Sequence, residues 1–329
     1  MDIDQFLARN TPTWNRLQFL TQRAGGGVRR LSSAELHELI ALYQRTTSHL
    51  SYAQTNFSDS ALTARLSQQV AASGAVIYGS RPKSWRSVGL FFTRTFPAAL
   101  WHIRRYVLVS AILTFAPAIV IGTWLANSPT ALQASAPAAA RQAYVNHDFA
   151  SYYRSQPASE FATEVYTNNV RVAVLTFIGG IALCIPTVIL LVINGANIGQ
   201  AAGLFAAAGQ TSKFYGLVLP HGLLELTSVV IAGAAGLRVG WTLIDPGDRP
   251  RLTALAEEAG RSVVLVLGVV ITLAIAGSIE GFVTGSALPT VVRVGIGVTV
   301  EAAFLIYAVV LGRSATAAGF TGALSESGR

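Results

Sequence analysis

The apolar and polar positions along this chain predict an all-α protein with a polytopic transmembrane helical bundle. Several apolar runs approach the roughly 20 residues that a helix needs to cross a ~30 Å hydrocarbon core, and polar segments separate them. The stretch at 127–167 is polar with few basic groups, so we expect an extracytoplasmic loop there. The predicted membrane segments of a transmembrane domain at 106–312 are residues 106–126, 170–193, 197–214, 216–244, 263–283 and 289–311.

The segment at 197–214 decides the topology, because its apolar part is short for a crossing. If it does not cross, five spans leave the C-terminus outside; if it crosses as a short or broken helix, six spans leave the C-terminus and residues 245–262 inside. Three arginines in that connection, Arg249, Arg251 and Arg261, favour the inside. We therefore predict six membrane segments and a cytoplasmic tail at 313–329.

Residues 1–80 are predicted to form a separate cytoplasmic helical domain. Apolar side chains recur at helical spacing up to the glycines at 25–27, which end the first helix. Ser32 and Glu35 form a capping-box sequence that opens a second helix, and a third is expected at about 59–78.

The charge distribution orients the chain. Only 12% of the residues are charged, about half the proportion in soluble domains. Residues 1–105 carry 13 basic and five acidic side chains, and the rest of the chain carries 11 of each, so the whole excess of +8 precedes the first span. This asymmetry predicts a multi-pass protein of the inner (plasma) membrane with a cytoplasmic N-terminus.

Residues 81–105 alternate aromatic and basic side chains, such as Trp85, Arg86, Arg94 and Trp101. We predict an interfacial helix that lies on the cytoplasmic leaflet and touches anionic lipid. This explanation of the basic charge is favoured over nucleic-acid binding. The single cysteine, Cys184, excludes an intramolecular disulfide.

The candidate chemistry is a set of polar residues at membrane depth. His221 and Glu225 lie four residues apart, so they share one helix face. Intramembrane ionisable groups are costly and usually face a bundle interior or a water-filled cavity. With six crossings, the residues expected to cluster in the outer half of the membrane are Asn168, Asn169, Arg171, His221, Glu225 and Glu280.

Two uses of this cluster remain open: a proton relay or half of a metal site, and a polar pair that fixes helix register. We expect the structural role and no metal or cofactor, since few further ligands lie at membrane depth. We also expect an ion pair of Arg171 with Glu280 or Glu225. Glu257, Glu258 and Arg261 superficially resemble a protease motif with wrong spacing, so we interpret them as a solvated helix face and predict no enzymatic activity.

A second candidate feature is a helix break or turn between two membrane segments. A turn is the simpler interpretation, and a discontinuous helix that exposes backbone groups to a solute is the alternative. Glycines four residues apart in the same region would also suit close helix contact, either within the protein or in a homodimer. The residues of the break or turn are Asn194, Gly195, Asn197 and Gly199.

Several motifs resemble the stage II sporulation protein M family of membrane proteins, in its actinobacterial branch. They are Asn168-Asn169-Val170-Arg171, Asn194-Gly195, Pro220-His221-Gly222-Leu223-Leu224-Glu225, Ala232-Gly233-Ala234-Ala235-Gly236 and Ile279-Glu280-Gly281-Phe282-Val283-Thr284. The resemblance implies a non-enzymatic scaffold that recruits envelope proteins, such as peptidoglycan-remodelling factors, and an association with MoxR-type ATPase systems. The alternative from the residues themselves is a proton- or ion-coupled transporter or channel that uses His221, Glu225 and Glu280.

Overall fold

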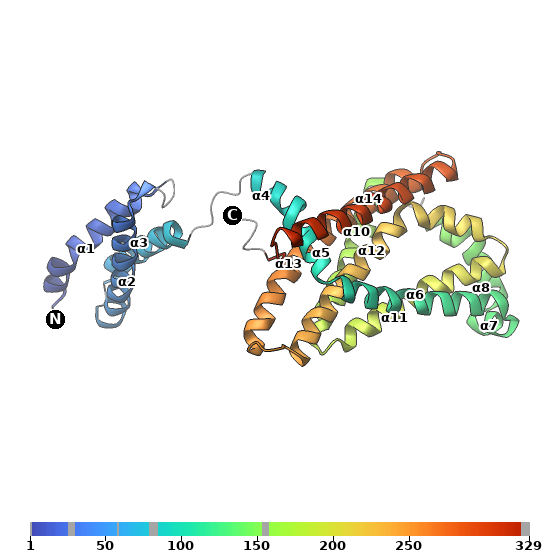
Figure 1. Ribbon diagram of the computed structural model, residues 1–329, viewed down its shortest axis with the longest axis horizontal. Helices are drawn as coiled ribbons and strands as arrows, with labels where there is room; N and C mark the ends of the chain where they lie inside the picture. Colours follow the sequence, from blue (N-terminus) through green and yellow to red (C-terminus); the bar gives the residue numbers. More distant parts are fainter. Residues whose placement is uncertain (1, 26–29, 58, 79–84, 153–157, 324–329) are drawn as a thin grey trace. The chain divides into compact units, whose positions relative to one another are not determined.

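The computed structural model describes residues 2–25, 30–57, 59–78, 85–152 and 158–323, and the regular structure within these ranges is helical throughout (Figure 1). This confirms the predicted all-α class. Contacts divide the chain into two units, Met1–Arg86 and Ser87–Arg329. The division lies close to the predicted boundary at residue 80, and residues 79–84 fall outside the described ranges.

The N-terminal unit consists of helices α1 (Ile3–Arg23), α2 (Ser33–Asn56) and α3 (Ser60–Tyr78). The predicted capping box forms at the start of α2, where the Ser32 and Glu35 side chains satisfy each other's backbone N–H groups. The indole of Trp14 is fully buried among the three helices and donates a hydrogen bond to Nδ1 of His49 at 3.1 Å. The predicted helical region is thus confirmed.

The aromatic and basic segment differs from the single interfacial helix that we predicted. It consists of α4 (Trp85–Leu90), the π-helix η2 (Phe91–Thr95) and α5 (Phe96–His102). Trp85 is 91% exposed, but α5 is buried against α13 and α14, and its Phe96 ring lies where a Cβ at Gly268 would be. Phe96 and most of α5 therefore belong to the bundle core, whereas Trp85 of α4 is exposed.

Among the described residues, six long helices form the bundle of the second unit. They are α6 (Arg104–Asn127), α10 (Ala158–Ile178), α11 (Ile185–Ala207), α12 (Thr211–Ile244), α13 (Arg251–Ile279) and α14 (Thr290–Ala317), and a π-helix, η5 (Glu280–Thr284), continues α13. Five of them are long and apolar enough to cross a membrane, namely α6, α11, α12, α13 with η5, and α14. Helix α10 is the exception because its N-terminal half is polar.

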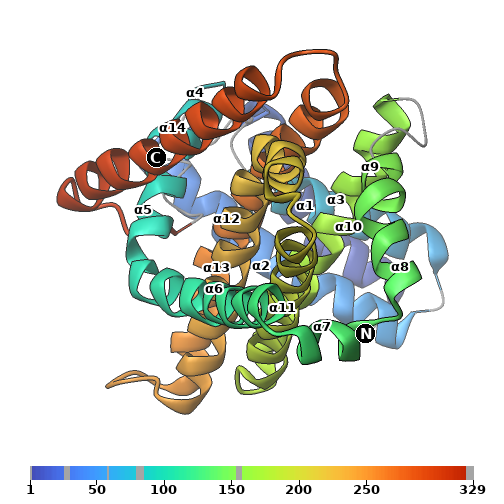
Figure 2. The ribbon, with the colours of Figure 1, turned by 90° about the vertical axis from the view of Figure 1, so that its right-hand side faces the viewer.

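Helix α12 is the centre of the bundle and packs against α6, α10, α11, α13 and α14, as the end-on view shows (Figure 2). Pro220 lies inside this helix and not at its entry, since α12 begins at Thr211. The core around it consists of small and branched apolar side chains, including Ile231, Ala235 and Leu273. Its polar side chains must therefore find partners on neighbouring helices.

The predicted boundaries of the second and third membrane segments were wrong. The chain reverses not at residues 194–197 but at Gly179–Cys184, between α10 and α11. Leu183 and Cys184 adopt left-handed conformations there, with φ of 55° and 68°, and Gly180 lies against the backbone of α12, with no room for a Cβ. This turn contains no polar side chain, so the hydropathy pattern does not show that one helix ends and the next begins there.

The predicted break at Asn194, Gly195, Asn197 and Gly199 is a continuous part of α11. Its glycines form a ridge against α6, where a Cβ at Gly195 or Gly199 would meet the carbonyl of Thr114 or Ala118. Close approach of two helix backbones is the usual role of small residues at this spacing. Packing within one protomer, and not a helix break, therefore explains these glycines.

The predicted extracytoplasmic loop is also largely helical. It contains α7 (Pro129–Ser135), α8 (Ala138–Ala143), the π-helix η3 (Tyr144–Asp148) and α9 (Phe149–Tyr152). These pieces cap one end of the bundle, because Val145 and Phe149 pack on Phe205 of α11 and Phe214 of α12. Lys213 Nζ also donates to the carbonyl of Val145 at 2.6 Å.

Candidate functional site

The candidate site is a buried polar cluster, which we define as His221, Glu225, Glu280, Thr284 and Asn169. His221 and Glu225 lie one turn apart on α12, Glu280 and Thr284 belong to η5, and Asn169 lies on α10. Three helices distant in sequence therefore meet at this point. His221 is 4% exposed and Glu280 is 3% exposed.

The side chains of the cluster contact one another in defined pairs. His221 Nδ1 lies 3.1 Å from Thr284 Oγ1, and its Nε2 lies 3.6 Å from Glu280 Oε1. Asn169 Nδ2 donates to Glu225 Oε1 at 2.8 Å. The side-chain oxygen or nitrogen atoms that His221, Glu225 and Glu280 offer lie within 4.8 Å of one another.

A π-helix shapes one side of the cluster. Glu280 is the first residue of η5 and Thr284 the last, so the widened turn points both side chains towards His221. Single-turn π-helices inside α-helices occur frequently at functional sites. Arg293 of α14 donates to the backbone carbonyl of Thr284, which holds the end of this turn in place.

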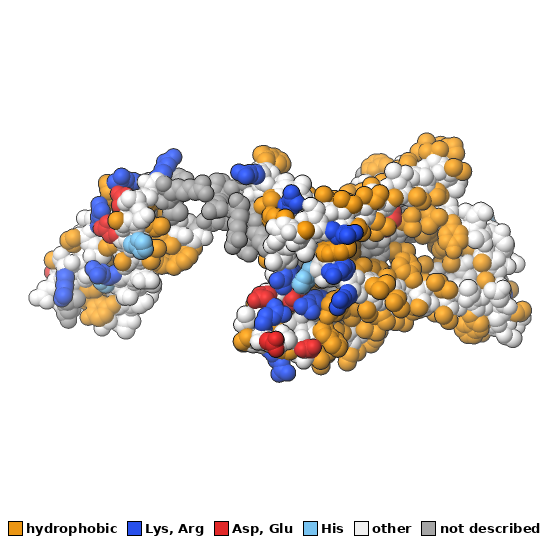
Figure 3. Space-filling model, viewed as in Figure 1, with side chains coloured by type: hydrophobic (Ala, Val, Ile, Leu, Met, Phe, Trp, Pro, Cys, Tyr) orange, Lys and Arg blue, Asp and Glu red, His pale blue; other side chains and the backbone are white. Residues whose placement is uncertain are grey.

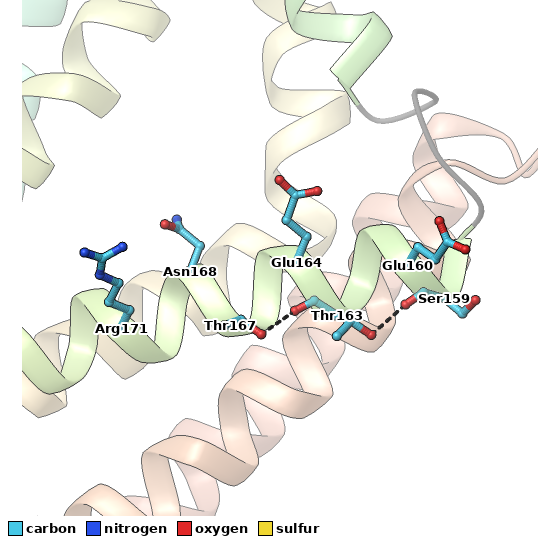
Figure 4. A pocket seen from close by; sticks show the side chains of 7 residues that line it. All are labelled: Ser159, Glu160, Thr163, Glu164, Thr167, Asn168 and Arg171. Carbon is cyan, nitrogen blue, oxygen red and sulfur yellow. Dashed lines mark hydrogen bonds between the residues drawn. The ribbon is translucent and has the colours of Figure 1, made fainter.

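The structure does not bring Asn168 and Arg171 into the cluster. They lie on another side of α10, and Figure 4 shows them in a row with Glu160 and Glu164. We define these four residues as the polar face of α10. Among the described residues Arg171 makes no salt bridge, so its expected ion pair with Glu280 or Glu225 is wrong.

The polar face of α10 lines an open cavity of about 880 Å³. The four residues recur every three or four positions, so they form a single stripe along the helix. Glu164 and Asn168 are exposed in this stripe, and the threonines beside them bond back to the helix through Thr163 Oγ1 and Thr167 Oγ1. The polar face is therefore available to water or to another molecule.

A second polar network was missed by the sequence analysis. Glu258 was interpreted as solvated but is 1% exposed. Its carboxylate pairs with Arg238 at 2.7 Å, Arg261 at 3.0 Å and His102 at 3.4 Å. Arg238 also donates to the Tyr106 hydroxyl at 3.2 Å. Arg238, near the end of a long apolar run, could have predicted this network, because an arginine in such a position needs a carboxylate on a neighbouring helix.

This second network lies at the opposite end of α12 from the buried polar cluster. Figure 3 shows basic and acidic side chains gathered on the surface of the second unit near the connection between α12 and α13. A further, half-buried contact lies between the two sites, where Thr227 Oγ1 donates to Glu301 Oε1 of α14 at 2.7 Å. Polar pairs thus tie α12 to its neighbours at several depths, consistent with a helix that is buried on most sides.

The arrangement of the buried polar cluster can hold a proton or a cation. It combines one imidazole with two carboxyl groups, and an amide and a hydroxyl orient them. Within the described part of the chain, these three ionisable residues are the group whose ligand atoms are close enough to share a metal ion. From the sequence we expected Glu280 near His221 and Glu225 but no metal, since few further ligands lie at membrane depth.

The fold and the buried polar groups define a polytopic α-helical membrane protein with a separate helical N-terminal unit. The family model of stage II sporulation protein M matches residues 111–285, more than half of the chain and all of the buried polar cluster. The protein therefore belongs to the stage II sporulation protein M family. A domain of unknown function (DUF8413) matches residues 4–79, which corresponds to the N-terminal unit.

A curated relative is the uncharacterized protein MJ0793 of Methanocaldococcus jannaschii. It is 31% identical to this chain over 126 residues, which cover 36% of this chain and 68% of the relative. No solved structure matches this chain.

Proposed function

We propose that this protein is a non-enzymatic scaffold of the plasma membrane that recruits a partner protein through the polar face of α10. The observation that carries the proposal is that this face is exposed and borders a cavity of about 880 Å³, although α10 packs along α12 and α13. Asn168 and Arg171 are exposed on this face, and exposed polar groups are costly to leave in hydrocarbon. A polar partner helix or loop would provide hydrogen-bonding groups for these two side chains.

The buried polar cluster has a supporting role in this proposal. Asn169 and Asn168 are neighbours, yet Asn169 bonds Glu225 and Asn168 faces the cavity. The contact with Glu225 fixes the rotation of α10 about its axis and therefore the direction of its polar face. The scaffold would thus hold its recruiting surface in one orientation.

The proposed topology has six crossings, with α10 as the crossing that is not apolar enough to stand out. Helices joined by short connections run antiparallel, so α10, α11, α12, α13 and α14 alternate in direction. The basic excess before α6 favours a cytoplasmic N-terminus. The polar face then lies in the outer half of the membrane, and both termini are cytoplasmic.

We propose an envelope protein as the partner, such as a factor that remodels peptidoglycan, as the resemblance to the stage II sporulation protein M family implies. On the cytoplasmic side, the N-terminal unit would dock a second protein, for which a MoxR-type ATPase is our candidate. The basic residues near α4 and α5 would contact anionic lipid. Nucleic acid has no role in this proposal.

Site-specific photo-crosslinking in membranes tests the proposal. A photoreactive amino acid at position 168 should capture one discrete protein at native expression. The same amino acid at Ile306, which is 62% exposed on the apolar surface of α14, serves as the control and should capture lipid. Lipid adducts from both positions, with no protein adduct from position 168, would refute recruitment by this face.

An ion-coupled transporter is the second candidate, because an imidazole and two carboxyl groups converge in the buried polar cluster. Ion or proton flux into proteoliposomes, measured for the wild type and for Glu225→Gln, separates the two functions. A transporter loses flux in the variant. A scaffold shows no flux in either protein.

A further inference from the structure

We propose that His221, Glu225 and Glu280 bind a divalent transition-metal ion of the zinc class inside the helix bundle. The proposal goes beyond the scaffold function and does not depend on it. A bound ion would join α12 to η5 and would add to the contacts that hold α10 in place.

The distances suit a metal ion. The three candidate ligand atoms lie within 4.8 Å of one another, and His221 Nε2 already lies 3.6 Å from Glu280 Oε1. Tetrahedral Zn²⁺ with bonds of about 2.0–2.2 Å needs ligand atoms roughly 3.3–3.6 Å apart. Binding would therefore require the two glutamate carboxylates to move closer to His221 Nε2 and to each other.

The charge also suits a metal ion. Two ionised carboxylates and a neutral imidazole carry two negative charges, which a divalent cation neutralises. No arginine or lysine among the described residues makes a salt bridge with Glu225 or Glu280. Burying an uncompensated carboxylate costs several kcal/mol. A cation would remove this cost for both groups together.

One carboxylate oxygen is buried without a partner. Glu280 Oε2 accepts no hydrogen bond from any described residue, and the Glu280 side chain is only 3% exposed. A buried carboxylate oxygen without a hydrogen bond needs an explanation, and an ion is one. Glu301 Oε2 on α14 shares this property, but Glu301 belongs to no such group of ligands among the described residues. This observation is independent of the distances among the three ligands.

The surroundings resemble the outer shell of a metal site. The contact between Nδ1 of His221 and the Thr284 hydroxyl orients the ring so that Nε2 faces Glu280. Asn169 holds one oxygen of Glu225. Metal-binding histidines and carboxylates usually have such partners, which fix the ligand orientation and raise affinity.

The ligand types select the ion. One imidazole nitrogen with two carboxylates suits Zn²⁺ and neighbouring transition ions, whereas Mg²⁺ and Ca²⁺ prefer oxygen ligands alone. Three protein ligands would leave a fourth position for water, as in open zinc sites. The Thr284 hydroxyl contacts Nδ1, on the other side of the imidazole ring from Nε2, so it orients the ring and is not itself a ligand.

Metal analysis of the full-length protein in detergent tests the proposal. Protein stripped with a chelator and reloaded with Zn²⁺ should hold about one ion per chain after desalting, and its melting temperature should rise. Co²⁺ should give the visible absorption of a four- or five-coordinate site. Mg²⁺ at the same concentration should do neither.

Matched variants separate a site from general binding. Glu280→Gln keeps the side-chain shape and should lower Zn²⁺ affinity at least about 100-fold, and Asn169→Leu should lower it about 10–100-fold. Glu301→Gln, which alters a half-buried glutamate of α14 outside the cluster, should bind like the wild type. Less than a tenth of an equivalent in the wild type, or equal binding by the Glu280→Gln and Glu301→Gln variants, would overturn the proposal and favour a proton shared by the two carboxyl groups.

Discussion

Replacing Glu258 by glutamine should destabilise the bundle far more than the same change at its neighbour, Glu257. Glu258 is 1% exposed, and its carboxylate lies 2.7 Å from Arg238 and 3.0 Å from Arg261. Glutamine has almost the same size and keeps one acceptor oxygen. The substitution therefore removes the negative charge while leaving the packing intact.

The loss of stability expected for Glu258→Gln depends on how exposed its two arginine partners are. Breaking a fully buried ion pair costs about 3–5 kcal/mol, because the remaining charge stays buried. The side chains of Arg238 and Arg261 are 20% and 14% exposed, so water partly hydrates them after the change. We therefore expect a loss of about 2–3 kcal/mol in the free energy of unfolding, below the fully buried range.

Glu257→Gln is the matched control on the same helical turn. Glu257 and its partner Arg249 are 44% and 37% exposed. Exposed pairs contribute about 0–1 kcal/mol, so this variant should unfold almost like the wild type. The pair also weakens with added salt, whereas the Glu258 network should resist it.

Thermal unfolding of the detergent-solubilised protein, followed by size-exclusion fluorescence, compares the two variants. For a unit of this size, 2–3 kcal/mol corresponds to a lower melting temperature by roughly 5–10 °C. Equal melting temperatures for Glu257→Gln and Glu258→Gln would show that Glu258 is hydrated and that its ion pairs do not stabilise the bundle through burial.

Three further predictions concern other parts of the chain. Asn169→Leu leaves Glu225 without its amide donor and should lower the free energy of unfolding by about 1–3 kcal/mol. Asn168→Leu, on the exposed polar face, should change it by less than about 0.5 kcal/mol. Equal melting temperatures of the two variants would contradict the assignment of Asn169 to the buried polar cluster. Gly199→Val should overpack α11 against α6 and lower the free energy of unfolding by about 1–3 kcal/mol or more. At Gly295 on α14 an added side chain meets open space, so Gly295→Val should be tolerated. SDS-induced unfolding compares the two variants. Burial, with a smaller contribution from Arg45, lowers the pKa of His49 in the folded protein. The pKa of histidine in the unfolded chain is about 6.5. The N-terminal unit should therefore keep its full stability above this pH and lose stability as the pH falls below it. Hydrogen exchange of α1 in the full-length protein should show this loss, and His49→Gln should abolish it, while the exposed His37→Gln should not.

The sequence alone determined the class of the protein. Apolar runs of membrane length, a low content of charge and a basic excess before the first run are properties of composition and order along the chain. Helix periodicity also placed the N-terminal unit, where the capping box at Ser32 and Glu35 is a local signal. The pair of His221 and Glu225 could be recognised because an interval of four residues fixes a shared helix face.

Only the tertiary structure decided where the chain turns and how the polar groups pair with one another. The reversal at Gly179–Cys184 depends on two left-handed residues and on contact with α12, so no polar side chain marks it. Glu280 joins His221, and Glu258 joins Arg238, because α13 packs beside α12 at a particular register. A hydropathy pattern depends only on residues that are neighbours in the sequence. The register of one helix against another depends on contacts between residues that are distant in the sequence, and a single sequence does not specify those contacts.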